Sequence, residues 1–236
     1  MRYLGGKAKI AKHVARVVDE HRLRPDQLVW EPFCGGLNVT SALWKRGVEV
    51  YASDVSEPLI ALYHAVQQGW DPPASCSEDE WRAWRELPPT DPRHGFARFG
   101  LSFGGDPNSG YAGSSDYTHP DGHLVRCRPA SACRKSLLRD VPRAAGIACI
   151  DFLAEPPDAL DFTIYCDPPY RGRRGYGMPF DHDAFVGVVA GYASRGSRVL
   201  VSEYEFPLGR VVWERERNAL MRGREKTHVE RIYLVE

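Results

Sequence analysis

The chain has 236 residues, of which 43% are hydrophobic and 26% charged, so we expect a soluble globular protein with a substantial core. It contains no run of about 18 apolar residues, and its first residues, MRYLGGKAKIAKHV, lack an apolar stretch of signal-peptide length. We therefore expect no membrane helix and a cytoplasmic location. Acidic and basic residues number 31 each, which argues against a uniformly basic surface but still permits one basic face. The six cysteines form no Cys-x-x-Cys pair, so reduced thiols are expected rather than a zinc site or disulfides.

Alternating strand and helix patterns begin near residue 28 and predict a parallel sheet. Residues 28–31 (LVWE) and 48–54 (VEVYASD) have the composition of buried strands. A glycine turn and a helical segment ending at Gly47 lie between them. Ser56 is expected to cap a second helix over 57–69. Because this order joins parallel strands through right-handed crossovers, an α/β fold is predicted.

The character of the sequence changes after Gly69. Residues 71–92 are rich in proline, and residues 100–123 are rich in Gly, Ser, Asp and Tyr, which predicts irregular loops. A helix is expected to begin at 133–140 (CRKSLLRD) and to lead back to the sheet. We therefore expect a catalytic domain made of residues 1–70 and 136–236, interrupted by an insert at 71–135.

The remaining sequence returns to the alternating pattern. The expected elements are strands at 147–152 (IACIDF), 161–167 (DFTIYCD), 197–204 (SRVLVSEY) and 228–236 (HVERIYLVE), and a helix at 181–196 capped by Asp181. The fold class predicted is a doubly wound, mostly parallel α/β sheet, in which ligands bind beyond the carboxyl ends of the strands. Residues 33–36, Asp54, Asp151 and Asp167 all fall at the ends of predicted strands, so we expect them on one edge of the sheet.

The turn after the first strand and the acid after the second point to a nucleoside ligand. Gly35 and Gly36 allow a ligand to approach the backbone closely, although a Gly-Gly pair is often only a turn. Neither the Gly-x-Gly-x-x-Gly fingerprint nor a phosphate-binding lysine motif is present. Asp54 is placed to accept hydrogen bonds from ribose hydroxyls, with helix capping beside Ser56 as the alternative. A ribose without phosphates suggests S-adenosylmethionine.

The tetrapeptide Asp167-Pro168-Pro169-Tyr170 ends a predicted strand and has the chemistry of a clamp for an amino group on a flat ring. Asp167 can accept one N–H of the amino group and the Pro168 carbonyl can accept the other, which favours charge build-up on the nitrogen. The prolines restrict the backbone that carries this carbonyl. Tyr170 offers a stacking face for a base removed from its duplex.

Three arginines, Arg171, Arg173 and Arg174, follow the tetrapeptide with no acid between them. They can hold phosphates beside the clamp, or they can belong to a solvated loop.

Four segments in this order resemble the Dam-type (D12 class, α group) adenine-specific DNA methyltransferases, particularly compact phage members. RYLGGKAKI resembles the family's RYxGGK motif, and EPFCGGLNVTSALW resembles EPFxGxG. YASDVSEPLIALY resembles ANDxNPxLI, and IYCDPPY resembles the catalytic motif. The resemblance covers nearly the whole chain. In one departure, the second glycine of EPFxGxG falls at Leu37, and Gly36 occupies the intervening position.

The resemblance implies a Rossmann-like methyltransferase that transfers a methyl group from S-adenosylmethionine to the 6-amino group of adenine in double-stranded DNA, by base flipping. Residues 71–135 would carry target recognition, whereas the sequence does not indicate whether a restriction partner exists. The implied cofactor pocket consists of Tyr3, Lys7, Phe33, Cys34, Gly35, Gly36, Asp54, Asp151, Phe152 and Asp167. The implied DNA contacts are Arg126, Arg128, Arg134 and Lys135 of the insert, together with the three arginines after the clamp.

Other functions remain open from the sequence. The same clamp could act on the amino group of cytosine, on adenine in RNA or on a protein glutamine. The chain could also be a non-catalytic nucleic-acid-binding relative, which the intact clamp and Lys7 disfavour. A nucleotide-binding oxidoreductase is disfavoured by the missing fingerprint. The DNA sequence recognised and the oligomeric state are not indicated.

Overall fold

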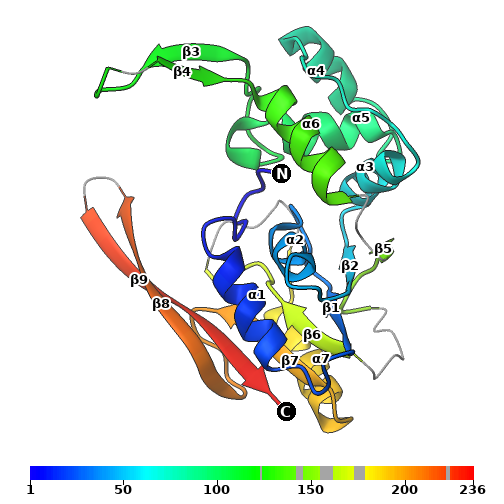
Figure 1. Cartoon of the computed structure of the whole chain (residues 1–236), viewed down its shortest axis with the longest axis vertical. Helices are drawn as coiled ribbons and strands as arrows, with labels where there is room; N and C mark the ends of the chain where they lie inside the picture. Colours follow the sequence, from blue (N-terminus) through cyan, green and yellow to red (C-terminus); the bar gives the residue numbers. More distant parts are fainter. Residues whose placement is uncertain (123, 142–145, 155–161, 173–178, 222–223) are drawn as a thin grey trace.

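The computed structural model describes residues 1–122, 124–141, 146–154, 162–172, 179–221 and 224–236 (Figure 1). The helices are α1 (Ala11–Glu20), α2 (Asn38–Trp44), α3 (Glu57–Gln67), α4 (Glu78–Arg85), α5 (Pro92–Gly95), η1 (Phe96–Gly100), η2 (Phe103–Gly105), α6 (Pro129–Asp140) and α7 (His182–Ser194). The strands are β1 (Leu28–Glu31), β2 (Val50–Asp54), β3 (Ser115–Thr118), β4 (Leu124–Cys127), β5 (Gly146–Cys149), β6 (Phe162–Cys166), β7 (Arg198–Glu203), β8 (Arg210–Met221) and β9 (Arg224–Val235). Among the described residues, no helix combines the length and apolar character needed to span a membrane.

Seven strands form one mostly parallel sheet in the order β5-β2-β1-β6-β7-β9-β8. The first five are parallel, and β9 runs antiparallel to both of its neighbours. In register, Val29 of β1 lies between Val50 of β2 and Thr163 of β6. The order reverses between β1 and β6, so the predicted doubly wound α/β fold is confirmed.

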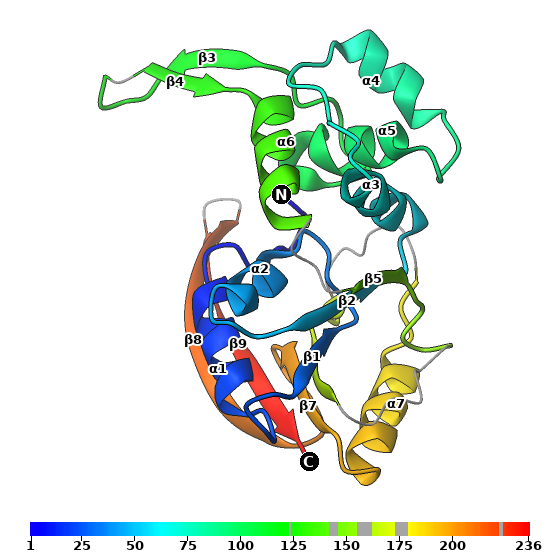
Figure 2. The same ribbon diagram turned by 45° about the vertical axis from the view of Figure 1, so that its right-hand side comes forward.

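Helices cover both faces of this sheet, as Figure 2 shows. On one face, α1 and α2 bury Val14, Val18 and Leu43 against sheet residues that include Tyr165 and Leu200. On the other face, α7 contributes a separate cluster, which contains Phe185, Val189 and Tyr192 of the helix together with Trp30, Ile164, Val199 and Val201 of the sheet. Strand side chains alternate between the two faces, and both faces are apolar, as expected for a sheet covered on both sides.

A second, helical part lies beyond the carboxyl ends of the strands (Figure 1). In it, α5, η1 and α6 pack on α3, and α4 packs on α5 and η1. The contact between α5 and α3 requires a glycine: a Cβ on Gly95 would lie 2.1 Å from the carbonyl oxygen of Pro58. The predicted insert, 71–135, corresponds to most of this part. Its carboxyl boundary, between residues 135 and 136, falls inside α6.

The prediction of irregular loops is wrong at two places. Residues 78–85 form α4, which begins with a capping box between Ser77 and Glu80. Residues 115–118 form β3, which pairs antiparallel with β4 in a hairpin that projects from the helical part (Figure 1). All four residues of β3 are exposed, so the strand has no buried face. Its sequence, SDYT, therefore lacks the alternation of apolar and polar residues that would predict a strand. Pairing of its backbone with β4 forms it instead.

Several elements were not predicted, namely α4, α5, η1, η2 and β4 of the insert and also α1 and β8. The helix α1 has apolar residues at helical spacing, Ala11, Val14, Ala15 and Val18, and this signal could have found it. The strand β8 begins RVVWERER, where charged residues outnumber apolar ones, and its register comes from pairing with β9.

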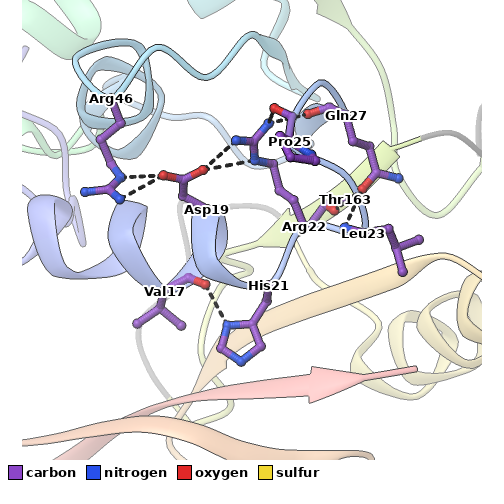
Figure 3. A network of polar contacts seen from close by, with 9 residues as sticks. All are labelled: Val17, Asp19, His21, Arg22, Leu23, Pro25, Gln27, Arg46 and Thr163. Carbon is purple, nitrogen blue, oxygen red and sulfur yellow. Dashed lines mark hydrogen bonds and ion pairs between the residues drawn. The ribbon is translucent and has the colours of Figure 1, made fainter.

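A polar network fixes the connection from α1 to β1, at the amino ends of the strands (Figure 3). Asp19 accepts hydrogen bonds from Arg22 Nη2 at 2.6 Å and from Arg46 Nε at 2.8 Å. Gln27 Oε1 accepts from the Leu23 amide at 2.9 Å and from Thr163 Oγ1 of β6 at 2.7 Å. The network therefore joins α1 and the end of α2 to the sheet, on the edge that faces away from the predicted site.

Candidate active site

A cavity of about 440 Å³ lies at the carboxyl ends of the parallel strands. The sequence-predicted residues that line it are Tyr3, Lys7, Phe33, Cys34, Gly35, Gly36, Asp54, Asp151, Phe152, Asp167 and Pro169. Pro168 is buried beneath the surface, and Tyr170 is joined to the cavity through its hydrogen bond with Lys7. The insert contributes Arg98, Phe99 and Pro107 to the wall, which the sequence analysis did not predict. The volume is in the range of small-molecule sites.

The turn after β1 is shaped by its contact with the amino-terminal loop. Gly35 has φ +42°, and a Cβ there would lie 2.9 Å from the ring of Tyr3. The Tyr3 ring stacks on Phe99 with centroids 5.6 Å apart, and the Tyr63 hydroxyl donates to the Gly35 carbonyl. The turn therefore needs glycine for its conformation and for the close approach of Tyr3.

Leu37 ends the same turn with φ +57° and ψ +31°, in the left-handed region. Among the described residues, no other residue except glycine has a positive φ. This is the position where the resembling family motif has glycine. The leucine side chain is 2% exposed and packs in the cluster beneath the helical part.

Asp54, the last residue of β2, organises the backbone on both sides of the cavity. Its Oδ2 accepts from the Gly35 amide at 3.1 Å, and its Oδ1 accepts from the Ser56 amide at 3.0 Å. Burial raises the pKa of Asp54, and these amide hydrogen bonds oppose the rise. Ser56 occupies the N-cap position of α3 but makes no side-chain capping bond. Asp54 thus supports the start of α3, and its carboxylate retains further acceptor capacity toward the cavity.

Lys7 reaches across the cavity to the predicted clamp. Its Nζ lies 2.6 Å from Asp167 Oδ1, 2.9 Å from Tyr170 Oη and 3.1 Å from a carboxylate oxygen of Glu230 on β9. An ammonium group has three N–H donors, so these three acceptors satisfy it completely. The Lys7 and Glu230 side chains are 5% and 2% exposed. Lys7 is therefore a partner of the clamp as well as a lining residue of the cavity.

Tyr170 is held by its hydroxyl and by its ring. The hydroxyl accepts from Lys7 and donates to Glu230 Oε1 at 3.3 Å. The ring packs edge-on against Tyr204 with centroids 4.8 Å apart. Its pKa is raised far above the usual value, chiefly by burial, so the phenol stays protonated and can donate.

The pKa values of the coupled Lys7–Asp167 pair reflect burial and mutual attraction. Burial raises the pKa of Asp167, although the Lys7 ammonium opposes the rise. Burial alone would lower the pKa of Lys7, but Asp167 and Glu230 outweigh it and raise that pKa. A raised pKa of Asp167 favours its neutral acid form, whereas a raised pKa of Lys7 favours the ammonium. We assign the pair as ammonium and carboxylate because Lys7 has two acidic partners within 3.1 Å.

Sequence reasoning missed three carboxylates around the clamp. Glu31 ends β1, lines the cavity and accepts from Thr40 Oγ1, and burial raises its pKa to about 8. Glu203 ends β7 and accepts from the Arg171 amide at 3.2 Å, and burial raises its pKa to about 7. Both are acids at strand ends, a signal that could have found them. Glu230 lies within β9 rather than at its end, so it carries no such signal.

The candidate DNA contacts differ in how they are paired. Arg128 pairs with Asp116 at 2.6 Å, Arg134 with Asp71 at 2.8 Å and Arg171 with Asp183 at 2.8 Å. Arg126 and Lys135 are exposed and form no ion pair with the described part of the chain. Arg173 and Arg174 lie outside the described residues. No acid lies between the three arginines in the sequence, but in the fold Arg171 is paired with Asp183 of α7.

Residues 3–83 match the family model for the D12 class N6 adenine-specific DNA methyltransferases. The matched segment includes Tyr3, Lys7, the glycine turn and Asp54, and it ends before Asp167. The family is one of enzymes that methylate adenine in DNA, as the resemblance in the sequence indicated. No curated protein matches the chain.

Solved structures similar to the chain include three methyltransferases. The rRNA methyltransferase aviRa from Streptomyces viridochromogenes is 15% identical, with 99% of this chain and 87% of that chain covered and a TM-score of 0.43. Magnesium protoporphyrin IX methyltransferase (ChlM) from Synechocystis PCC 6803, with bound SAM, is 12% identical, with coverage of 97% and 80% and a TM-score of 0.40. The glycopeptide N-methyltransferase MtfA is 13% identical, with coverage of 95% and 74% and a TM-score of 0.38.

Proposed function

We propose that the chain is a D12-class adenine-specific DNA methyltransferase that uses S-adenosylmethionine and acts through Asp167. One observation carries the proposal: Asp167 opens into the same cavity as the glycine turn and Asp54, which belong to the segment that matches the family. The amino-group clamp and the nucleoside pocket thus share one space.

The cavity fits S-adenosylmethionine chemically. Asp54 offers carboxylate oxygens for ribose hydroxyls, Phe33 and Phe152 offer apolar surface for adenine, and Glu31 offers a buried carboxylate for an ammonium group. When bound, the cofactor supplies a methyl group on a positively charged sulfur, with S-adenosylhomocysteine as the leaving group. The turn at Gly35 and Gly36 lets it approach the backbone.

Asp167 receives the target amino group. Its Oδ1 is held by Lys7, and a carboxylate has acceptor capacity on both oxygens, so Oδ2 can accept one N–H of adenine. The Pro168 carbonyl accepts the second N–H. These acceptors increase electron density on the nitrogen and direct its lone pair toward the methyl group. Tyr170, fixed by Lys7 and Tyr204, stacks on the base.

Double-stranded DNA is the proposed substrate, and the target adenine leaves the stack to reach Asp167. The helical part and its β3–β4 hairpin, within residues 71–135, would carry recognition of the sequence. A DNA substrate of this kind would place the enzyme in the cytoplasm of a bacterial or phage-infected cell.

The test combines methyl transfer with cofactor binding. The wild-type chain should transfer labelled methyl groups to the 6-amino group of adenine in duplex DNA, detected by mass spectrometry of nucleosides. Asp167→Asn should reduce turnover by at least about a hundredfold while cofactor affinity changes only a few-fold, because Asp167 acts mainly in the transition state.

Asp54→Asn is the complementary variant. It should weaken cofactor binding by about 1–3 kcal/mol, measured by calorimetry, since a buried hydrogen-bond partner is altered. Methyl transfer by the wild-type enzyme to cytosine, RNA or protein glutamine instead of DNA adenine would contradict the proposed substrate. Normal turnover by Asp167→Asn would contradict the mechanism.

A further inference from the structure

Glu230 contacts both Lys7 and Tyr170, and it lies outside the family match and outside the catalytic motif. It belongs to β9, the antiparallel strand near the far edge of the sheet, and is 1% exposed. Its Oε1 lies 3.1 Å from Lys7 Nζ and 3.3 Å from Tyr170 Oη. A buried carboxylate without cationic or hydrogen-bonding partners would be strongly unfavourable. Here one partner, Tyr170, belongs to the clamp, and the other, Lys7, binds the clamp residue Asp167.

We infer that Glu230 is a positioning residue for methyl transfer: by fixing Lys7 and Tyr170 together, it holds Asp167 with one carboxylate oxygen directed at the target amino group. This inference rests on the proposed function. Lys7 has three donors and three acceptors, so loss of the negative charge on Glu230 weakens one of these contacts and shifts Lys7 toward Asp167. The same loss weakens the hydrogen bond that the Tyr170 hydroxyl donates to Glu230, so the hydroxyl is held mainly by Lys7.

Glu230 also influences the proton affinity of Asp167 through its charge. Lys7 serves two carboxylates, so Glu230 takes a share of the ammonium that would otherwise bind Asp167 alone. Burial is the largest influence on the pKa of Asp167 and raises it, while Lys7 lowers it and Glu230 raises it. Glu230 therefore keeps Asp167 a better proton and hydrogen-bond acceptor than it would be with Lys7 as its sole neighbour. Within the described part of the chain, the titratable and charged groups near this pair include Lys7, Glu31, Tyr165, Cys166, Tyr170 and Glu203, with Arg215 opposite Glu230 in register and Arg231 next to it in β9.

The principal variant is Glu230→Gln, which keeps the shape of the side chain and removes its charge. With duplex DNA as substrate, kcat should fall by about 10- to 100-fold, because small displacements of a reacting group have effects of that size. The dissociation constant of S-adenosylmethionine, measured by calorimetry, should stay within about threefold. The matched control is Glu214→Gln on β8, where the carboxylate is 62% exposed and pairs with Arg231, and it should behave as wild type.

The pH dependence separates positioning from a merely structural role. The acid limb of the kcat/KM profile should move to lower pH in Glu230→Gln and to higher pH in Lys7→Met, because the two neighbours act on Asp167 in opposite directions. A loss of folded enzyme alone would reduce the rate at every pH without moving the limb.

A double-mutant cycle tests the contact without any activity measurement. The unfolding equilibrium constants of Glu230→Gln, Lys7→Met and the double variant are compared in urea. The double variant should be about tenfold more stable than the product of the single effects predicts, since both changes disrupt one interaction. Additive effects with an unshifted acid limb would overturn the inference. Wild-type enzyme that fails to methylate DNA adenine would instead overturn the proposed function, and the cycle would still decide whether Glu230 fixes Lys7.

Discussion

Leu37 shows how a single residue stores strain beside the cofactor turn. Its left-handed backbone costs a branched side chain about 1–2 kcal/mol, yet the side chain is buried in the core of the helical part. The sequence keeps the leucine because burial of its side chain offsets the strain. A glycine, as in the resembling motif, would reverse both effects.

The comparison of Leu37→Ala with Leu37→Gly tests this balance. Both variants lack the buried side chain, at a cost of about 2–5 kcal/mol, but only glycine removes the strain. Glycine normally destabilises a structured position by about 0.5–1 kcal/mol relative to alanine. At position 37 we expect the opposite order in urea unfolding, with the glycine variant at least as stable. A glycine variant clearly less stable than the alanine variant would show that the turn is not strained.

Glu31 should make the ligand-free protein less stable as the pH rises. Burial raises its pKa from 4.5 to about 8, so the folded state binds a proton between these values that the unfolded state has released. Stability from this residue is therefore fully present below about pH 4.5 and is lost as the pH rises to about 8, with a slope of up to roughly 1.4 kcal/mol per pH unit.

Glu31→Gln should remove this slope, because the amide does not titrate and can still accept from Thr40. Urea unfolding at pH 5, 6.5 and 8 measures the difference between the variant and the wild type. As the pH rises, the free energy of unfolding of the variant should increase relative to that of the wild type. A constant difference across the three pH values would mean that Glu31 is already ionised in the folded protein.

At the scale of elements, the network around Asp19 should stabilise the fold without affecting the site. Asp19 is bound by Arg22 and Arg46, which lower its pKa below the ordinary value even though burial alone would raise it. The stabilisation is thus present above about pH 4 and is lost as the pH falls through the lowered pKa. Figure 3 shows this network, and none of its residues lines the cavity.

Asp19→Asn is expected to cost about 1.5–3 kcal/mol near neutral pH, the usual worth of hydrogen bonds to charged groups. The cost should shrink below pH 4, and cofactor affinity should remain unchanged. Asp26→Asn on the same connection is the control, since Asp26 is 85% exposed and its nearest arginine nitrogen is 3.7 Å away. A change in cofactor affinity in Asp19→Asn would show that the two edges of the sheet are coupled.

The elements near the cavity were the easiest to predict from the sequence. The strand β1 has the predicted bounds, and Asp181 caps α7 by accepting from the amides of residues 183 and 184, because short apolar runs and capping residues act locally. The collection of Asp54 and Asp167 at one edge follows from parallel strand order alone. Glu230 could not be predicted, because its partners lie in two distant segments and its neighbours in β9 carry no local signal of a site. The strand β3 was equally hidden, since its exposed residues carry no pattern.

For the whole molecule, zero net charge means that attraction to DNA must come from local groups. Arg171 is 64% exposed but is paired with Asp183, so it must exchange that partner for a phosphate. Arg126 and Lys135 have no such competitor among the described residues. Binding of a phosphate by Arg171 therefore requires the loss of an ion pair, whereas binding by Arg126 or Lys135 requires no such loss among the described residues.

Salt dependence should reveal these differences. Replacing Arg126 or Lys135 with Ala should flatten the plot of log affinity against log salt by up to about 0.9 for each phosphate that the side chain neutralises. Arg171→Ala should weaken binding to cognate and non-cognate DNA alike, and Asp183→Asn should strengthen both, because phosphate contacts carry no base information. Fluorescence anisotropy over several salt concentrations measures both effects. A wild-type slope in every variant would move the DNA contacts to other residues.

The cluster of Lys7, Asp167, Tyr170 and Glu230 also determines when the protein can first act. Lys7 and Asp167 are 160 residues apart, and Tyr170 and Glu230 are 60 residues apart. A growing chain on the ribosome consequently lacks the finished clamp until β9 has been made and has paired with β7. Two separately produced halves, divided between the exposed strand β3 and its partner β4, would each lack part of the clamp and would recover it only on reassociation. Methylated adenine in a cell's DNA would then be a covalent record that the two halves had met.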